Sequence, residues 1–444
     1  MTDTSMPEKK FKSLLEVDAR TKKRNAAEKR FKAYGIAAIA IGIFFLVALL
    51  GAIIQNGIPA FTQTYVTVDI ELLEEKLDKS GERDIEKIKK VSTFGYKPLI
   101  QNALVAATDG IETEVADKKL AQILSDSAAA QIRDFVINNP DRIGDTVEFT
   151  LLASSRVDGY LKGRVTREDL ARDKNLSPLY LDLIDAMEER GAVERIFNSA
   201  FITGADASEK RPESAGMGVS MLGSFFMMLV VLILALPIGV AASIYLEEFA
   251  PQNRFTDLIE VNISNLAAVP SIVFGILGLA VFIQFAHLPQ SAPIVGGLTL
   301  TLMTLPTIVI STRASLKAVP PSIRDAALGV GASKMQSVFH HVLPLAMPGI
   351  LTGTIIGLAQ ALGETAPLLL IGMVGYIASN YPDGIASGFL DPNSAMPAQI
   401  YEWAKRADPA YYERAWGGII ILLVFLLTMN IIAIILRRRF ERRW

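Results

Sequence analysis

The sequence predicts an all-α polytopic membrane protein with six transmembrane helices and a soluble α+β domain inserted between the first two. The 444 residues are 51% hydrophobic and 20% charged, and the apolar residues gather in long uncharged blocks. A helix that crosses a membrane needs about 20 predominantly apolar residues. Buried helices of a large soluble protein would not be expected to lack charge over so many blocks. We expect spans at residues 34–54, 217–246, 262–285, 294–312, 347–375 and 416–436.

The charged residues predict which parts of the chain lie inside the cell. Lys and Arg crowd both ends of the chain and the loop between the fourth and fifth spans, residues 313–345. Basic residues near span ends favour the cytoplasmic side, so we expect both termini and this loop to be cytoplasmic. The loop at 246–261 is acidic and fits the rule poorly. The expected organisation is a basic tail at 1–33, a retained transmembrane helix at 34–56, an extracytoplasmic domain at 57–215, a helical core at 216–437 and a basic tail at 438–444.

The extracytoplasmic segment contains patterns of both helices and strands. We expect amphipathic helices at 70–77, at 116–137 and from Ser177 to about Gly191, and a strand at 147–152. The segment contains no motif that indicates chemistry. Two roles therefore stay open for it, a docking surface for a soluble partner and an accessory domain without chemistry of its own.

The composition excludes several classes of function. The chain has no cysteine, which excludes a disulfide scaffold, thiol catalysis and cysteine metal sites. Three histidines and a net charge of −2 favour neither a histidine-rich metal site nor a nucleic-acid partner. The sequence also lacks a G-x-x-x-x-G-K-[ST] phosphate-binding loop and the H-E-x-x-H and G-x-S-x-G motifs. We therefore expect no catalytic site, no metal and no cofactor in this chain.

The most informative segment is the loop at 319–344. Its spacing predicts two short helices, because Ser-x-x-Asp and Ser-x-x-Gln patterns occur where capping boxes would start them. Gly329 and Gly331 predict the turn between the two helices. The expected capping pairs are Ser322 with Asp325 and Ser333 with Gln336. The apolar face of the first helix, which two alanines make shallow, comprises Ile323, Ala326, Ala327 and Val330.

This loop resembles the EAA loop of binding-protein-dependent ABC importer permeases. The match consists of the Asp325-Ala326-Ala327 triplet, the following Gly331 and the closing Leu343-Pro344 pair, at the family's spacing. Two positions depart from the family pattern, since Asp325 replaces Glu and His341 replaces Ile. The resemblance implies a MetI-like permease core in the bacterial inner membrane. It also implies that this loop transmits movement from a separate ATPase subunit to the spans.

The fifth span carries a stripe of small residues and one acid. Gly349, Gly353 and Gly357 recur every fourth residue, a spacing that lets helices pack closely inside a membrane. Gln360 and Glu364 lie one turn apart beside that stripe. An acid at mid-membrane costs about 2.5–3.5 kcal/mol on insertion scales, so Glu364 should face protein or a water-filled path. We expect a break of the helix beside it, where freed backbone groups would line a pathway.

The run from Gly363 to Leu368 is similar to the phosphate-importer branch of the same family, whose members often carry Arg where this chain has Gln360. A carboxylate can accept a hydrogen bond from the O–H of monohydrogen phosphate and repels sulfate, which has no such donor. Gln360, Glu364 and Thr365 are therefore candidate pathway residues. The alternative is that Glu364 pairs with an Arg or is protonated and holds two helices together. Arg313 is another candidate anion contact, although a snorkelling anchor fits its position better.

The resemblance implies a permease subunit that carries out alternating access. Its implied partners are an ABC ATPase dimer, a second homologous permease and a periplasmic phosphate-binding protein, with no nucleic acid. Another oxyanion or small solute would fit the same motifs. A membrane sensor with an outward-facing domain is the alternative from a different class, but the inside segments are too short for an output domain.

Overall fold

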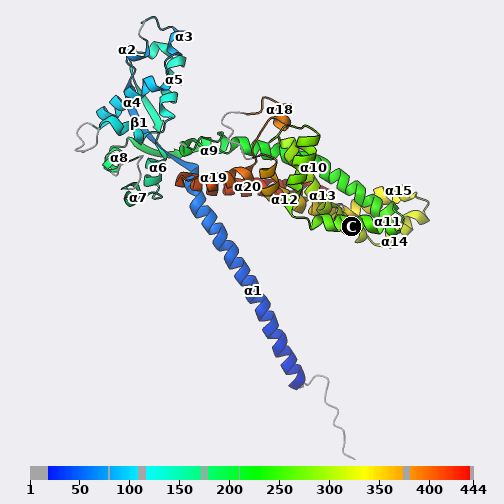
Figure 1. Ribbon diagram of the computed structural model, residues 1–444. Coiled ribbons are helices and arrows are strands. Elements are labelled where there is room, and N and C mark those ends of the chain that lie inside the picture. Colours follow the sequence, from blue (N-terminus) through cyan, green and yellow to red (C-terminus); the bar gives the residue numbers. More distant parts are fainter. Residues whose placement is uncertain are drawn as a thin grey trace, which may run out of the picture. The chain divides into compact units, whose positions relative to one another are not determined.

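The computed structural model describes residues 19–78, 81–108, 117–171, 176, 179–209, 211–373 and 381–440 (Figure 1). The chain forms two compact units, Met1–Gln55 and Asn56–Trp444. The first unit contains most of the helix α1 (Ala19–Gly57), whose apolar side chains from Ile36 to Ile54 are largely exposed. A helix that is apolar on all sides and exposed in the isolated chain is suited to a lipid environment.

The second unit begins with a three-stranded antiparallel sheet. Its strands β1 (Thr62–Glu71), β2 (Thr146–Leu152) and β3 (Val193–Phe197) are arranged in the order β2-β1-β3. Val68 lies opposite Phe149 on one side of the central strand, and Tyr65 lies opposite Glu194 on the other. The surrounding helical elements are η1 (Ile58–Phe61), α2 (Glu74–Leu77), α3 (Ile85–Ile88), α4 (Thr93–Ala107), η2 (Asp117–Ile123), α5 (Ala128–Asn138), η3 (Pro140–Arg142), α6 (Ser155–Leu161), α7 (Arg167–Ala171), α8 (Leu179–Glu189) and α9 (Ser199–Thr203).

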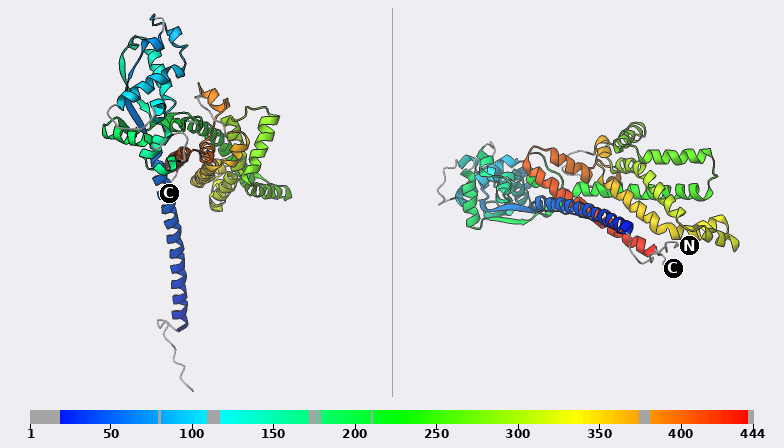
Figure 2. Two further views of the ribbon diagram at one scale, coloured as in Figure 1. Left: turned by 60° about the vertical axis from the view of Figure 1, so that its left-hand side comes forward. Right: turned by 90° about the horizontal axis from the view of Figure 1, so that it is seen from below.

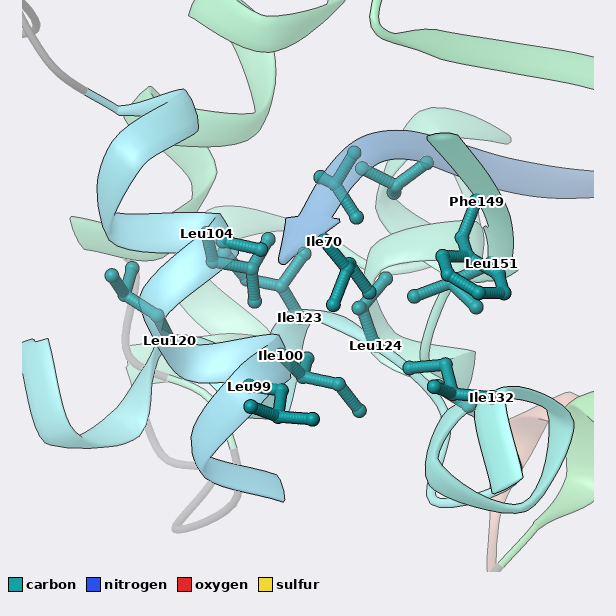
Figure 3. Close-up of a cluster of buried hydrophobic side chains, with 14 of the residues drawn as sticks. Ile70, Leu99, Ile100, Leu104, Leu120, Ile123, Leu124, Ile132, Phe149 and Leu151 are labelled. Atoms are coloured by element: carbon teal, nitrogen blue, oxygen red, sulfur yellow. The ribbon is translucent and has the colours of Figure 1, made fainter. Parts of the chain in front are cut away.

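This part of the chain has a hydrophobic core of its own. Period-two alternation along β1 places Val66, Val68 and Ile70 in the interior. Figure 3 shows how side chains from α4, η2 and β2 converge on Ile70. The labelled members of that core are Ile70, Leu99, Ile100, Leu104, Leu120, Ile123, Leu124, Ile132, Phe149 and Leu151.

The sequence located two elements of this core and misplaced two others. The strand expected at 147–152 is β2, and the helix expected to end near Gly191 is α8, with Gly191 at φ +76°. The helix expected at 70–77 is wrong in its first half, because Ile70 and Glu71 complete β1. The helix expected at 116–137 is two elements, η2 and α5, separated by a turn that carries Ser125.

The rest of the second unit is a helical bundle. Helix α13 (Pro293–Lys317) packs most extensively against α10 and α16, and α16 (Leu343–Gly363) also packs against α20 (Pro409–Phe440). In Figure 1 and in the right-hand view of Figure 2, the yellow segment that carries α14 and α15 lies at one end of this bundle. The other elements are α10 (Gly218–Ile244), η5 (Tyr245–Phe249), α11 (Arg254–Ala267), α12 (Ser271–Gly278), η6 (Leu279–Phe285), α14 (Pro321–Gly329), α15 (Lys334–Ser337), η7 (Val338–Val342), α17 (Ala366–Leu370), α18 (Ile385–Leu390) and α19 (Met396–Lys405).

The helical bundle and α1 contain the candidate membrane spans. Within the described residues, five helices are long and apolar enough to cross a membrane, or up to six if the bent pair α11 and α12–η6 counts as one span. The third expected span, 262–285, is wrong at its start, since α11 and the next helix meet at 100° around Pro270. The fifth expected span, 347–375, is too long, because α16 ends at Gly363 and residues 374–375 lie outside the described part of the chain.

A cluster of buried charges joins the sheet-containing part of the second unit to the start of α20. Lys162 bridges Asp158 at 2.7 Å and Glu413 at 3.0 Å, and Arg164 also pairs with Glu413. Arg414 is 2% exposed and donates to the carbonyl oxygens of Ala60 and Glu213, at 3.0 Å each. Burial lowers the pKa of Lys162 to about 8 against the opposing effect of Asp158. A buried ion pair is costly to break from one side, so this cluster fixes the sheet-containing part to α20.

Candidate functional site

The loop at 319–344 forms a helical elbow. Helix α14 starts directly at Pro321 with Pro320 as its N-cap, so the capping box expected at Ser322 is wrong. Proline suits the first position of a helix because its missing N–H has no partner there. The turn adopts φ +90° at Gly331, a conformation that disfavours other residues. The second expected capping box, Ser333 with Gln336, is present.

One side of the elbow is exposed in the isolated chain. Ala327 is only 6% exposed and packs inward, whereas Asp325 and Ala326 are exposed. Leu328 is 48% exposed and Val330 is 86% exposed. Met335 and Phe339 on the second limb of the elbow are also exposed. A set of apolar side chains held on a rigid turn and open to solvent is typical of a protein-binding surface.

The end of the elbow continues into α16. Leu343 and Pro344 are half-buried and occupy the first turn of that helix, where a proline is tolerated. Val338 and Val342, on the π-helical turn η7, are buried against α13 and α16. The elbow is therefore continuous with the fifth span.

The small residues of α16 lie against α13. A Cβ atom added at Gly349 would lie 2.9 Å from Cβ of Ser315, and one added at Gly353 would overlap the side chain of Ser311. At Gly357 the nearest atom is a side-chain carbon of Ile308 at 3.5 Å, an ordinary contact. The spacing of the three glycines thus coincides with the face on which α16 approaches α13, most closely at its first two positions.

The acid of the fifth span lies at a helix break. Helix α16 ends at Gly363, Glu364 has extended backbone, and α17 starts at Ala366. Glu364 and Thr365 are half-buried, and Gln360 one turn earlier is exposed. Within the described residues, the Glu364 carboxylate has neither a hydrogen bond nor an ion pair. Pairing of Glu364 with an Arg therefore has no support inside the described part of this chain.

The break is fixed by packing on α12. Pro367 is buried at the start of α17, and a Cβ added at Gly275 of α12 would lie 2.7 Å from the Pro367 Cα. Glu364, with extended backbone, and Thr365, with helical backbone angles, thus form a two-residue link between two helices that are each held by neighbours. The half-buried Glu364 carboxylate is therefore held at a break between two packed helices.

Arg313 occupies a different kind of position. Its Nε lies 3.3 Å from Oε2 of Glu247, and its Nη2 also pairs with Glu260. Lys317, one turn further along α13, is 3.6 Å from the same Glu247 oxygen. The charge of Arg313 is therefore compensated by two carboxylates, and the side chain links α13 to η5 and α11.

The sequence did not identify these carboxylates as part of the site. Glu247 and Glu248 belong to the acidic loop that fits the positive-inside rule poorly, and their partners come from the basic loop at 313–345. Acidic and basic residues therefore occur together at this end of the bundle because they form ion pairs with each other. The sequence contained only one signal for it, the opposite charge of two loops expected on the same side.

The comparisons with known proteins show the family of the chain. Residues 235–444 match the family described as binding-protein-dependent transport system inner membrane component, and residues 18–170 match a domain of unknown function, DUF3333. The phosphate transport system permease protein PstA 1 of Mycobacterium tuberculosis (strain CDC 1551 / Oshkosh) is 31% identical over 52% of this chain and 74% of its own length. The chain belongs to this family of ABC permeases. It is a multi-pass inner membrane protein on the branch of PstA.

Further relatives extend the likeness across bacteria. PstA of Haemophilus influenzae is 30% identical over 49% of this PstA-type chain and 74% of its own length. A probable ABC transporter permease of Bacillus subtilis, YqgI, is 30% identical over 50% of this chain and 78% of its own length. One chain of an inward-facing MetNI methionine ABC transporter aligns with 51% of this chain and over 98% of its own length. The aligned residues are 14% identical, and the TM-score is 0.41. The sequence relatives, and not that structure, establish the family.

Proposed function

We propose that this PstA-type permease imports inorganic phosphate by alternating access, driven by a separate ATPase. The relatives named for phosphate transport carry the substrate assignment. The proposed complex contains an ABC ATPase dimer of the PstB type, a second permease of the PstC type and a periplasmic phosphate-binding protein of the PstS type. This chain would supply one half of the membrane path and would bind no cofactor.

The proposed topology places both termini and the elbow in the cytoplasm. It assigns residues 57–215 to an extracytoplasmic domain and 216–437 to the permease core. The basic residues at both tails support this orientation. The exposed apolar side chains of the elbow, Leu328 and Val330, support docking of α14 and the following turn onto an ATPase subunit. In this proposal Asp325, Ala326 and Gly331 lie on the docking limb, and the inward-packed Ala327 holds that limb in place. Leu343 and Pro344 pass its movement to α16.

The proposed phosphate path passes the break in the fifth span. Glu364 lies there without a partner in the described part of the chain, flanked by Thr365 and, one turn earlier, by Gln360. A carboxylate that accepts a hydrogen bond from the O–H of monohydrogen phosphate would favour phosphate over fully ionised sulfate. The second permease would close the other side of the path and supply any cationic group that contacts the anion.

The test uses the complete complex reconstituted in proteoliposomes. We expect ATP hydrolysis to be stimulated by binding protein loaded with phosphate and not by binding protein loaded with sulfate. Equal stimulation by both anions, or stimulation only by another solute, would overturn the phosphate assignment. Substituting Ala326→Glu on the exposed side of the elbow should abolish uptake by placing a charge at the docking surface. Uptake that survives this substitution would show that the exposed side of α14 is not the docking surface.

Two isosteric variants test the path. Glu364→Gln should reduce the preference for phosphate over sulfate by about tenfold or more, because the amide can donate a hydrogen bond to sulfate. Glu402→Gln is the matched control, because this acid lies outside the proposed path on α19, where it pairs with Lys405. An unchanged preference in Glu364→Gln would exclude the carboxylate as a selectivity element.

A further inference from the structure

Two consecutive acids at the end of α10 face two different neighbours. Glu247 and Glu248 lie on the π-helical turn η5, which extends α10 beyond Ile244. A π-helical turn changes the angle between successive side chains and occurs often at functional positions. Glu247 pairs with Arg313 of α13, whereas Glu248 pairs with Arg324 of α14.

Glu248 and Arg324 form a forked ion pair in which several hydrogen bonds fix the orientation of the guanidinium group. Arg324 donates from Nε to both carboxylate oxygens, at 3.1 and 3.2 Å, and from Nη2 to Oε1 at 2.6 Å. Its remaining donors reach the backbone carbonyl oxygens of Val319 at 2.8 Å and Leu316 at 3.0 Å. One guanidinium therefore connects α14, the end of α13 and the end of α10. Such forked bonds restrict orientation more than a point charge does.

Burial makes this forked pair costly to break. The Glu248 side chain is 7% exposed and the Arg324 side chain is 23% exposed. Loss of one partner would leave the other charge largely removed from water, which is strongly unfavourable. The second pair adds a parallel connection, because Arg313 holds Glu247 and also Glu260 of α11. By contrast, Lys317 is 60% exposed and approaches Glu247 only from the outside.

We propose that the Glu248–Arg324 pair is the positioning element that carries movement of the elbow into α10. This inference rests on the proposed function, since it assumes that an ATPase moves α14. Apart from this pair, α14 is connected to the spans by the chain itself, through α13 before it and α16 after it, and by apolar packing of Ile323 against the cluster that contains Ile244 of α10. The forked pair adds an oriented polar connection to α10, which packs along α13 and contacts α16, so that α10 moves with the elbow.

The experiment measures the number of ATP molecules hydrolysed per phosphate imported by the complete complex in proteoliposomes. Glu248→Gln and Arg324→Lys each weaken the forked pair, and Lys317→Gln is the control at the exposed edge of the same charge cluster. We expect the first two variants to raise the ratio of ATP hydrolysed to phosphate imported by about tenfold, within the usual range of coupling energies. Lys317→Gln should leave the ratio unchanged. The charge exchange Glu248→Arg with Arg324→Glu should recover part of the coupling.

The ratio separates positioning from simple stability. If the pair had a purely structural role, the variants would lower the amount of assembled complex, the rate of ATP hydrolysis and the rate of uptake together. An unchanged ratio of ATP hydrolysed to phosphate imported in the assembled Glu248→Gln complex would overturn the inference. If Glu248→Gln does not assemble, Arg324→Lys decides by the same ratio, because it keeps the positive charge. Failure of the wild-type complex to import phosphate would overturn the proposed function instead. Coupled wild-type transport with unaffected variants would overturn the inference alone.

Discussion

The contact between α16 and α13 allows a prediction with opposite outcomes at neighbouring glycines. A methyl group at Gly349 would put its carbon 2.9 Å from Cβ of Ser315. Carbon atoms in contact are separated by about 3.5–4.0 Å, so the helices would have to move apart by about 0.6–1.1 Å. At Gly353 the overlap with Ser311 is more severe, and it involves Cβ, which rotamer changes cannot move.

The expected cost follows from this overlap. Overpacking a well-packed interface costs about 1–3 kcal/mol, so Gly349→Ala and Gly353→Ala should lower the free energy of unfolding by that amount. Gly357→Ala is the matched control, because its new methyl group would lie 3.5 Å from Ile308. That variant should be neutral or more stable by up to about 1 kcal/mol, since alanine favours helix over glycine.

The assay is thermal unfolding of the purified complex in detergent, followed by phosphate uptake. Ser311→Gly removes the atoms that Gly353→Ala would meet, so the double variant should be more stable than the sum of the two single changes indicates. A double-mutant cycle measures that difference directly. Equal stability of Gly353→Ala and Gly357→Ala, or no coupling between positions 353 and 311, would refute the packing argument.

Three further predictions concern the elbow and the buried charges. Val330→Glu should weaken binding of the ATPase in a pull-down assay without lowering the melting temperature of this chain, because the Val330 side chain is 86% exposed. An unchanged amount of ATPase in the pull-down would contradict the docking surface. Gly331→Ala should destabilise the elbow by about 1–2 kcal/mol because of its positive φ. Gly329→Ala, with open space around it, should not, and hydrogen exchange across the elbow compares the two. Burial lowers the pKa of Lys162 from 10.5 to about 8, so the unfolded state binds more protons between these values and stability should rise with pH across that window. Lys162→Met should remove this rise in stability, and melting curves at pH 7.5 and 10 measure it. An identical pH dependence in the wild-type and Lys162→Met proteins would show that Lys162 does not titrate in that window.

Local sequence signals predicted the elbow well. Its two limbs, the turn at Gly331 and the capping box of Ser333 with Gln336 depend on backbone preferences within a few residues. The same holds for the break beside Glu364, where a glycine and a proline lie close together. The proposed roles of these residues in docking and in the path stay predictions.

The boundaries of helices and strands were harder to predict than their presence. The strand β1 was missed because its apolar alternation runs directly into a second amphipathic pattern at 70–77, and pairing with β2 and β3 decided where the strand ends. The third span was misplaced because hydropathy records length and polarity but not direction. The 100° bend at Pro270 interrupts a segment that is uncharged throughout.

The sequence by itself determined that this chain is a helical membrane protein, where its apolar blocks lie and which family motif it carries. These properties depend on composition and on spacings of a few residues, which transfer free energies and backbone sterics govern directly. Only the tertiary structure decided which charges meet. Glu248 and Arg324 are 76 positions apart, and Lys162 and Glu413 are 251 apart. Pairing over such separations is a property of packed helices and not of local sequence, because many other bases and acids could have formed the same pairs.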